Sequence, residues 1–266
     1  MKGIMVLLLA IFASTLAFKD SPKMSNAVVL YNEHGRITNG TLAVKGQFPY
    51  LVRIRLYSFA NKINQCSGSI ISSIWVLTAA HCFGNINYCD IYFGEISEKT
   101  ARFQHRVYNK SFVLHPEYDG GSKHNDAAMI IIPRISFSKY VNKIELANEA
   151  KHANLTGWRA YAPGWGARND TPIVSKHLYY INVTIADDEL CEAFHYFQPS
   201  QLCVSTAHNQ STCRGDSGGP LTLHKGNFLA GISSYGGPSC LNNVPQVFTR
   251  VTKIFTWIRD VMDIVS

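Results

Sequence analysis

Residues 213–220 read CRGDSGGP, and residues 78–82 read TAAHC. The glycines around Ser217 allow tight backbone turns and leave room for a substrate beside a nucleophilic hydroxyl. The same G-x-S-x-G pattern is typical of α/β-hydrolases, but there an acid and then a histidine follow the serine in the chain. Only His224 follows Ser217 here, with no Asp or Glu between them. The sequence therefore disfavours the G-x-S-x-G turn of an α/β-hydrolase, which is called the nucleophile elbow. It favours a triad in which the histidine comes first in the chain, then the aspartate, then the serine.

Both upstream partners are present in suitable contexts. His81 directly follows an apolar run and adjoins Cys82, which could pin it; a lone histidine would otherwise be interpreted as structural. Asp126 immediately precedes the apolar run 127–132, which we expect to be a buried strand. A buried carboxylate needs a partner. We therefore predict that His81, Asp126 and Ser217 form a catalytic triad.

The chain of 266 residues is 46% hydrophobic and 16% charged, enough for one large domain or two small ones. Short punctuated apolar runs predict an all-β fold. The clearest strand candidates are residues 48–59, 69–77, 86–93, 128–132, 177–185 and 227–233. Residues 187–197 and the C-terminal stretch are typical of helices. The polar stretch 133–155 is the best linker between two β-rich halves, although a single large β-domain remains an alternative.

The N-terminus is typical of a secreted protein. Residues 1–17 have the charged flank, apolar core and small residues of a signal peptide, and their apolar stretch is too short for a membrane anchor. Residues 18–36 are polar and are interpreted as a propeptide. We therefore expect a secreted, extracellular protein with no membrane segment.

Charge and histidine content exclude several function classes. The formal net charge is +7, or +5 for residues 37–266, but no two Lys or Arg are adjacent, so we expect no nucleic-acid partner. The ten histidines show neither an HExxH motif nor clustered Cys and His spacing. We expect no metal and no cofactor.

Seven cysteines in a secreted chain favour disulfides. We expect three bridges among Cys66, Cys82, Cys191, Cys203, Cys213 and Cys240, with Cys89 left as a free thiol or, alternatively, in an intermolecular disulfide. Spacing alone does not choose among the possible pairings.

The chain resembles the chymotrypsin-like serine proteases of the trypsin superfamily. The resemblance rests on residues 37–40 (ITNG), TAAHC, Asp126, residues 164–166 (GWG) and CRGDSGGP, and it covers residues 37–266. The phrases RITNG and VNKIEL are similar to insect digestive members. The resemblance implies a serine endopeptidase built from two antiparallel six-stranded β-barrels packed together with a C-terminal α-helix. The first barrel would span about residues 37–132, the linker 133–155, the second barrel 156–250 and the helix 251–264.

The resemblance also assigns roles to individual residues. It implies the bridges Cys66–Cys82, Cys191–Cys203 and Cys213–Cys240, and an oxyanion hole made by the N–H groups of Gly215 and Ser217. It implies a zymogen: an activating protease would cleave after Arg36, and the freed α-amino group of Ile37 would pair with Asp216.

Specificity depends on positions where the chain departs from its relatives. Ser211 stands where trypsin-like members carry an acid, so cleavage after Lys or Arg is disfavoured. Tyr235 replaces the usual Trp in Ser234-Tyr235-Gly236, and Gly236 leaves one pocket wall open. Gln246 replaces the Gly of aromatic-cleaving members; it would narrow the pocket, bind a polar P1 group or turn to solvent. We expect cleavage after aromatic residues, Leu or smaller residues.

The remaining expectations concern partners. Arg214 would lie at the pocket rim, either favouring acidic substrate residues or simply solvated. Partners would be protein or peptide substrates, the activating protease and protease inhibitors, and we expect a monomer. The alternative function is a non-catalytic binding protein with a protease fold, although this chain keeps every triad residue. Glycosylation sequons occur at Asn39, Asn109, Asn154, Asn169, Asn182 and Asn209.

Overall fold

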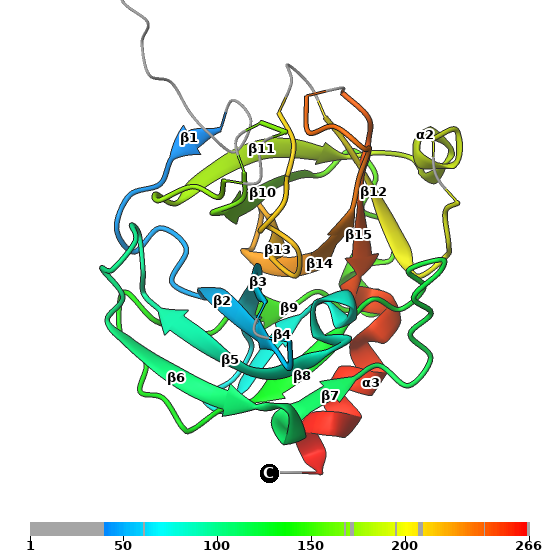
Figure 1. Cartoon of the computed structure of the whole chain (residues 1–266). Coiled ribbons are helices and arrows are strands. Elements are labelled where there is room, and N and C mark those ends of the chain that lie inside the picture. The colour runs from blue at the N-terminus through cyan, green and yellow to red at the C-terminus, as the bar shows by residue number, and fades with distance from the viewer. Residues whose placement is uncertain are drawn as a thin grey trace, which may run out of the picture. The chain divides into compact units, whose positions relative to one another are not determined.

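The computed structural model describes residues 40–264 except 61, 168, 171, 172, 195, 207–209 and 242 (Figure 1). By contacts the chain divides into Met1–Glu33 and His34–Ser266, and only the second unit is described below. The expected signal peptide, the propeptide, the Arg36–Ile37 cleavage site and the sequons at Asn39 and Asn209 lie outside the described residues.

The fold is mostly β, as predicted, and its first half is a curved antiparallel sheet. Its strands are ordered β6-β5-β2-β3-β4-β8-β7. The bounds are β2 (Leu51–Ser58), β3 (Ile63–Ile70), β4 (Trp75–Thr78), β5 (Ile86–Phe93), β6 (Phe103–Tyr108), β7 (Phe112–Leu114) and β8 (Ala128–Ile131). The two edge strands, β6 and β7, are consecutive in the chain and separated only by the 3-10 turn η2 (Asn109–Ser111). Counted as one bent strand they make six strands, although no β6–β7 pairing joins the edges in the described part.

The second half is a closed six-stranded barrel. Its strands are β10 (Arg159–Gly164), β11 (Tyr179–Ile185), β12 (Gln201–Ser205), β13 (Pro220–Leu223), β14 (Phe228–Tyr235) and β15 (Gln246–Arg250). The ring closes because β11 pairs with β10 on one side and with β12 on the other. Two short strands attach to it: β1 (Thr41–Leu42) beside β11, and β9 (Glu145–Leu146) parallel to β14.

Side-chain alternation explains why these segments form a barrel. Along β11, Ile181, Val183 and Ile185 are buried, whereas Asn182 and Thr184 between them are exposed. Successive strand residues point to opposite faces, so one face fills the core with branched apolar side chains. The exposed face carries the sequon at Asn182.

The helices match the sequence expectation unevenly. The C-terminal helix α3 (Val251–Asp263) ends within a residue of its predicted limit and buries Ile254 and Ile258. The helix predicted over 187–197 is only α2 (Asp188–Glu192). The polar linker contains β9 and α1 (Glu149–His152). No described helix has the length and apolar character needed to cross a membrane.

One predicted strand is in fact two. Residues 69–77 divide between the end of β3 and β4, because residues 71–74 turn back on themselves. The Ser72 hydroxyl accepts a hydrogen bond from the N–H of Ile74, and Trp75 O accepts one from the N–H of Ile71. Serine hydroxyls stabilise such turns, and the apolar pattern around them conceals the break.

Candidate active site

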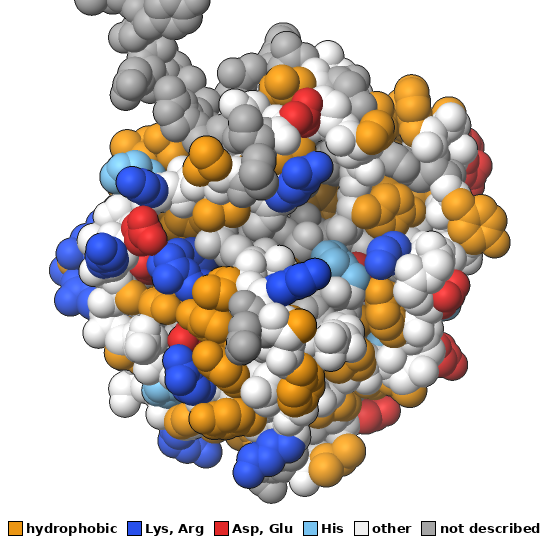
Figure 2. Space-filling view, in the orientation of Figure 1, with side chains coloured by type: hydrophobic (Ala, Val, Ile, Leu, Met, Phe, Trp, Pro, Cys, Tyr) orange, Lys and Arg blue, Asp and Glu red, His pale blue; other side chains and the backbone are white. Residues whose placement is uncertain are grey.

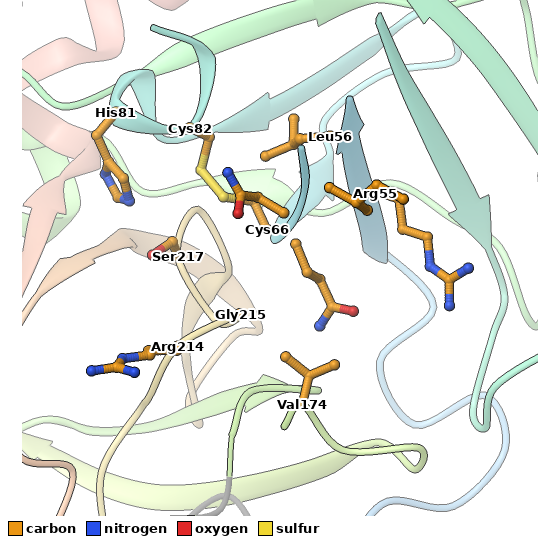
Figure 3. Close-up of a pocket in the computed structure, with 12 residues that line it drawn as sticks. Arg55, Leu56, Cys66, His81, Cys82, Val174, Arg214, Gly215 and Ser217 are labelled. Atoms are coloured by element: carbon orange, nitrogen blue, oxygen red, sulfur yellow. A yellow bond between two sulfur atoms is a disulfide. The ribbon is translucent and has the colours of Figure 1, made fainter. Parts of the chain in front are cut away.

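A cavity of about 610 Å³ lies between the two β-rich halves and is lined by strand residues of the first half and loop residues of the second (Figure 3). His81 and the disulfide partners Cys66 and Cys82 line it from the first half. Gly215 and Ser217 line it from the second. The two conspicuous sequence motifs, about 130 residues apart, are therefore brought to one site.

His81 is held by a short, covalently anchored turn. It lies in the 3-10 helix η1 (Ala80–Phe83), directly after β4, and its neighbour Cys82 is bonded to Cys66 of β3. The His81 N–H donates to Asp126 Oδ1 at 2.9 Å, and His81 Nδ1 lies 2.7 Å from Asp126 Oδ2. Asp126 thus fixes both the backbone and the ring of the histidine.

Asp126 is fully buried and is held from the opposite barrel as well. The Ser234 hydroxyl of β14 donates to Asp126 Oδ2 at 2.6 Å, and the Thr249 hydroxyl of β15 donates to the Asp126 carbonyl at 2.8 Å. Burial by itself would raise the pKa of Asp126, but the hydrogen bonds from His81 and Ser234 outweigh it, and the pKa lies below its ordinary value. The carboxyl is therefore ionised at neutral pH.

The ionised carboxylate determines the tautomer of His81. A carboxylate only accepts hydrogen bonds, so the proton of a neutral imidazole must be on Nδ1, which faces Asp126. Nε2 is then an acceptor. The Ser217 hydroxyl has no hydrogen-bond partner among the described residues, and the His81 side chain is 22% exposed. A proton acceptor and an unengaged hydroxyl therefore line the same cavity.

The loop carrying Ser217 has a backbone that requires glycine. Gly215 and Gly218 have φ of +100° and +79°, in the left-handed region, and a Cβ at Gly218 would collide with the Thr78 hydroxyl. The Ser217 carbonyl accepts the N–H of Ser67 at 2.8 Å. In contrast, the N–H groups of Gly215 and Ser217 donate to no described residue. Two backbone donors thus remain available beside the hydroxyl.

Asp216 is turned away from the cavity and is 1% exposed. Its carboxylate accepts the N–H of Gly166 at 2.6 Å and that of Cys213 at 2.9 Å. Added Cβ atoms at Gly164 or Gly166 would collide with this carboxylate, which explains the two glycines of GWG. No described cation contacts Asp216, and burial raises its pKa to about 7.

A second cavity, of about 170 Å³, is also lined by Ser217. Its walls include the predicted pocket residues Arg214, Ser234, Tyr235, Gly236 and Gln246. Ser211 is not among its lining residues: the hydroxyl is buried and donates to the Cys240 carbonyl at 2.6 Å.

Gln246 lines this second cavity and is fixed by hydrogen bonds. The side chain is buried, Oε1 accepts from the Thr212 hydroxyl at 2.9 Å, and Nε2 donates to the Val244 carbonyl at 3.2 Å. The carboxamide lies so close to Gly236 that a Cβ there would collide with it. The side chain is therefore not turned to solvent; narrowing of the cavity and a hydrogen bond to a polar P1 group both stay predictions.

The sequence matches the family described as Trypsin over residues 37–258. The chain belongs to the trypsin family. It is 38% identical over 228 residues to Serine protease 1 of Drosophila melanogaster, covering 85% of each chain. It is 32% identical to a chymotrypsin of Phaedon cochleariae, covering 84% of this chain and 81% of the relative. This trypsin-family protein is a serine endopeptidase.

Solved structures are similar as well. A structure described as HL collagenase superposes with a TM-score of 0.79 at 27% identity, covering 85% of this chain and 98% of the other. The collagenase of Hypoderma lineatum is 30% identical over 263 residues, 97% of each chain. Mouse neuropsin has the same fold, with a TM-score of 0.73 at 24% identity over 84% of this chain and 98% of that one.

The cysteines of this trypsin-family protein are paired as the resemblance implied. The disulfides are Cys66–Cys82, Cys191–Cys203 and Cys213–Cys240, and Cys89 is a buried free thiol. Ligand atoms of Cys66, His81 and Cys82 lie within 4.8 Å of one another. Because both sulfurs are oxidised, neither can supply a thiolate to a metal ion.

Sequence reasoning missed several residues of this site. Ser67 and Thr249 hold the segments that carry Ser217 and Asp126 from the opposite half of the fold, and Thr212 fixes Gln246. Thr212 adjoins the CRGDSGGP motif, so its position beside the pocket was a usable signal. Ser67 and Thr249 lie in ordinary strand sequences, and only tertiary contact reveals their roles.

Proposed function

We propose that this endopeptidase hydrolyses peptide bonds through an acyl-enzyme on Ser217. His81 Nε2 takes the hydroxyl proton as Ser217 Oγ attacks the carbonyl carbon, and later gives it to the leaving amine. Asp126 holds the ring and stabilises the imidazolium, and water then releases the acyl group. The hydrogen-bonded His81–Asp126 pair beside the unengaged Ser217 hydroxyl carries the proposal.

Two backbone donors support the tetrahedral intermediate. The N–H groups of Gly215 and Ser217, which donate to no described residue, would bind the oxyanion as it forms. Removing a single oxyanion donor costs roughly a hundredfold to a thousandfold in the kcat of another serine protease. Because a side-chain substitution does not remove a backbone N–H group, the proposed function is tested at Ser217.

A fluorophosphonate probe tests this function. The activated protein should be labelled at Ser217, and Ser217→Ala should abolish both labelling and peptide hydrolysis. A folded, correctly cleaved protein that is not labelled would support the alternative, a non-catalytic binding protein.

We propose that the P1 residue is small or medium-sized and uncharged. The cavity of about 170 Å³ has no acidic side chain among its described lining residues to neutralise a Lys or Arg. The tethered Gln246 carboxamide also occupies space that a large aromatic ring would need. Ala, Val and Leu should be preferred to Phe and Tyr. One relative is named chymotrypsin. The preference proposed for this chain would differ from that of an enzyme selective for aromatic residues because of Gln246.

Replacing Gln246 tests the pocket proposal. Gln246→Gly should raise kcat/KM for Phe and Tyr substrates by at least about tenfold relative to Ala, since a pocket contact of this kind is worth roughly 1–3 kcal/mol. Thr212→Val, which removes only the tether, should give a smaller change in the same direction. An unchanged ranking in both variants would contradict the proposal.

We propose that the enzyme is secreted as an inactive monomeric precursor. An activating protease would cleave after Arg36, and the new α-amino group of Ile37 would enter and pair with Asp216. The buried carboxylate without a described cationic partner supports this. N-terminal sequencing of active material should begin at Ile37, and Ile37→Gly should remain inactive after cleavage. Peptide-like protease inhibitors should bind only the cleaved form.

A further inference from the structure

The two cavities meet at the nucleophile. Ser217 and Arg214 line both the cavity of about 610 Å³ and that of about 170 Å³. The proposed function places the P1 side chain in the smaller one. The larger one is assigned to the residues after the scissile bond, because it contains His81, which gives its proton to the leaving amine. In Figure 3, His81 and Ser217 stand at one end of this cavity and Arg55 at the other. The leaving segment of the substrate therefore runs from Ser217 toward Arg55.

Strand register gives the position of Arg55 along that segment. Ser67 of β3 contacts Ser217 through its N–H, and Gln65, two residues earlier on β3, pairs with Arg55 of β2. Two strand residues span about 7 Å and the step between strands adds about 5 Å. An extended substrate advances about 3.3 Å per residue. Arg55 is thus roughly three residues beyond the scissile bond, within reach of P2′ to P4′.

The surroundings of Arg55 carry more positive than negative charge. The Arg55 guanidinium makes one hydrogen bond to a described residue, from Nη2 to Glu98 Oε1 at 2.9 Å, and both side chains are about one-third exposed. Lys99 and Lys176 are exposed and form no ion pair with any described residue, and the Lys176 carbonyl accepts the N–H of Glu98 at 2.7 Å. Arg55 thus contacts the Glu98 side chain, Lys99 follows Glu98 in the chain, and the Lys176 backbone contacts the Glu98 backbone. Figure 2 shows Lys and Arg side chains around the central hollow.

Arg53, on the same strand, is an arginine whose charge is fully paired, and it provides a comparison for Arg55. It forms two hydrogen bonds with Glu95, at 2.6 and 2.8 Å, and both side chains are at most 4% exposed. That pair is closed and neutral. Arg55, in contrast, lines the larger cavity, which Arg53 does not. Both arginines line a further cavity of about 450 Å³, together with Glu98 and Lys99. Arg55 therefore retains donors that a substrate can reach.

We propose that Arg55 is a specificity residue that selects substrates with Asp or Glu two to four positions after the scissile bond. The substrate carboxylate accepts a hydrogen bond from Arg55 and is held in the field of Lys99 and Lys176, while Arg214 adds positive charge at the near end. Glu98 competes for the same guanidinium. This inference rests on the proposed function, because the chain direction follows from the P1 cavity.

Fluorogenic peptides test the proposal. One P1 residue is kept constant, and Asp, Ala or Lys is placed in turn at P1′ to P4′ for the activated enzyme. At one or more of P2′ to P4′, kcat/KM should be about threefold to fivefold higher for Asp than for Ala, the range of a partly exposed ion pair. The ratio should fall as salt is added.

Variants then assign the effect. Arg55→Gln should remove the Asp preference and Arg55→Glu should turn it into a Lys preference, whereas Glu98→Gln should increase it by freeing the guanidinium. Arg259→Gln, the same charge change at an exposed position on α3, should leave it unchanged. Equal effects of Arg259→Gln and Arg55→Gln, or Asp preference unchanged in every Arg55 variant, would overturn the proposal.

Failure of the two proposals can be told apart. Without fluorophosphonate labelling and hydrolysis, the proposed function itself fails. Hydrolysis and the P1 ranking can be as expected while peptides with Asp, Ala or Lys at P1′ to P4′ are cleaved with equal kcat/KM. In that case only the role of Arg55 is refuted.

Discussion

The buried carboxylate of Asp216 should make the uncleaved chain lose stability as pH rises. Its pKa is about 7 in the folded chain and near the ordinary 3.8 when unfolded, so the folded state holds the proton more tightly. Below the unfolded pKa the carboxyl is protonated in both states and does not change the free energy of unfolding. As pH rises above that value the free energy of unfolding falls, and the fall levels off above pH 7. Between about pH 5 and about pH 8 this linkage removes roughly 2–3 kcal/mol from the free energy of unfolding.

Urea unfolding of the uncleaved chain at several pH values measures this loss. Ser217→Ala prevents self-cleavage, and Asp216→Asn in that background removes the titrating group. Between about pH 5 and about pH 8, the free energy of unfolding should fall by roughly 2–3 kcal/mol more in the chain with the Asp216 carboxyl than in the Asn variant. Cleavage after Arg36 should abolish the difference, because the Ile37 cation would favour the ionised form. Parallel pH profiles for the two uncleaved chains would refute the reasoning.

Three further outcomes follow from local contacts. Ser234→Ala should lower kcat about tenfold with little change in KM, because Asp126 loses a 2.6 Å hydrogen bond; a raised KM at unchanged kcat in steady-state kinetics would show instead that Ser234 only shapes the pocket. Gly166→Ala should destabilise the protein by more than about 2 kcal/mol in urea, since the new Cβ collides with Asp216; a stability equal to wild type would show that the carboxylate can move away freely. Cys89 should react with a thiol reagent only after unfolding, because it is fully buried and burial raises the pKa of its thiol. Rapid labelling of the folded chain would contradict its assignment as a core residue, as would a dimer on a non-reducing gel that Cys89→Ser removes.

The sequence alone determined the residue types and their order. Chain order disfavoured the nucleophile elbow of an α/β-hydrolase, and the spacing of TAAHC and CRGDSGGP indicated a family whose fold the structure has. Strands with strict alternation, such as β11, and the amphipathic α3 were predictable because one face of each must be buried. These features are local, so a single sequence carries them.

Tertiary structure decided what depends on contacts between distant residues. The orientation of Gln246 is fixed by Thr212, 34 positions away, and Asp126 is held by Ser234, 108 positions away. The pairing of Arg55 with Gln65 across β2 and β3 brings it to the cavity that Ser217 also lines, which its sequence context does not show. Such contacts arise only when the two halves of the fold form and pack, because hydrogen bonds and burial act through space and not along the chain.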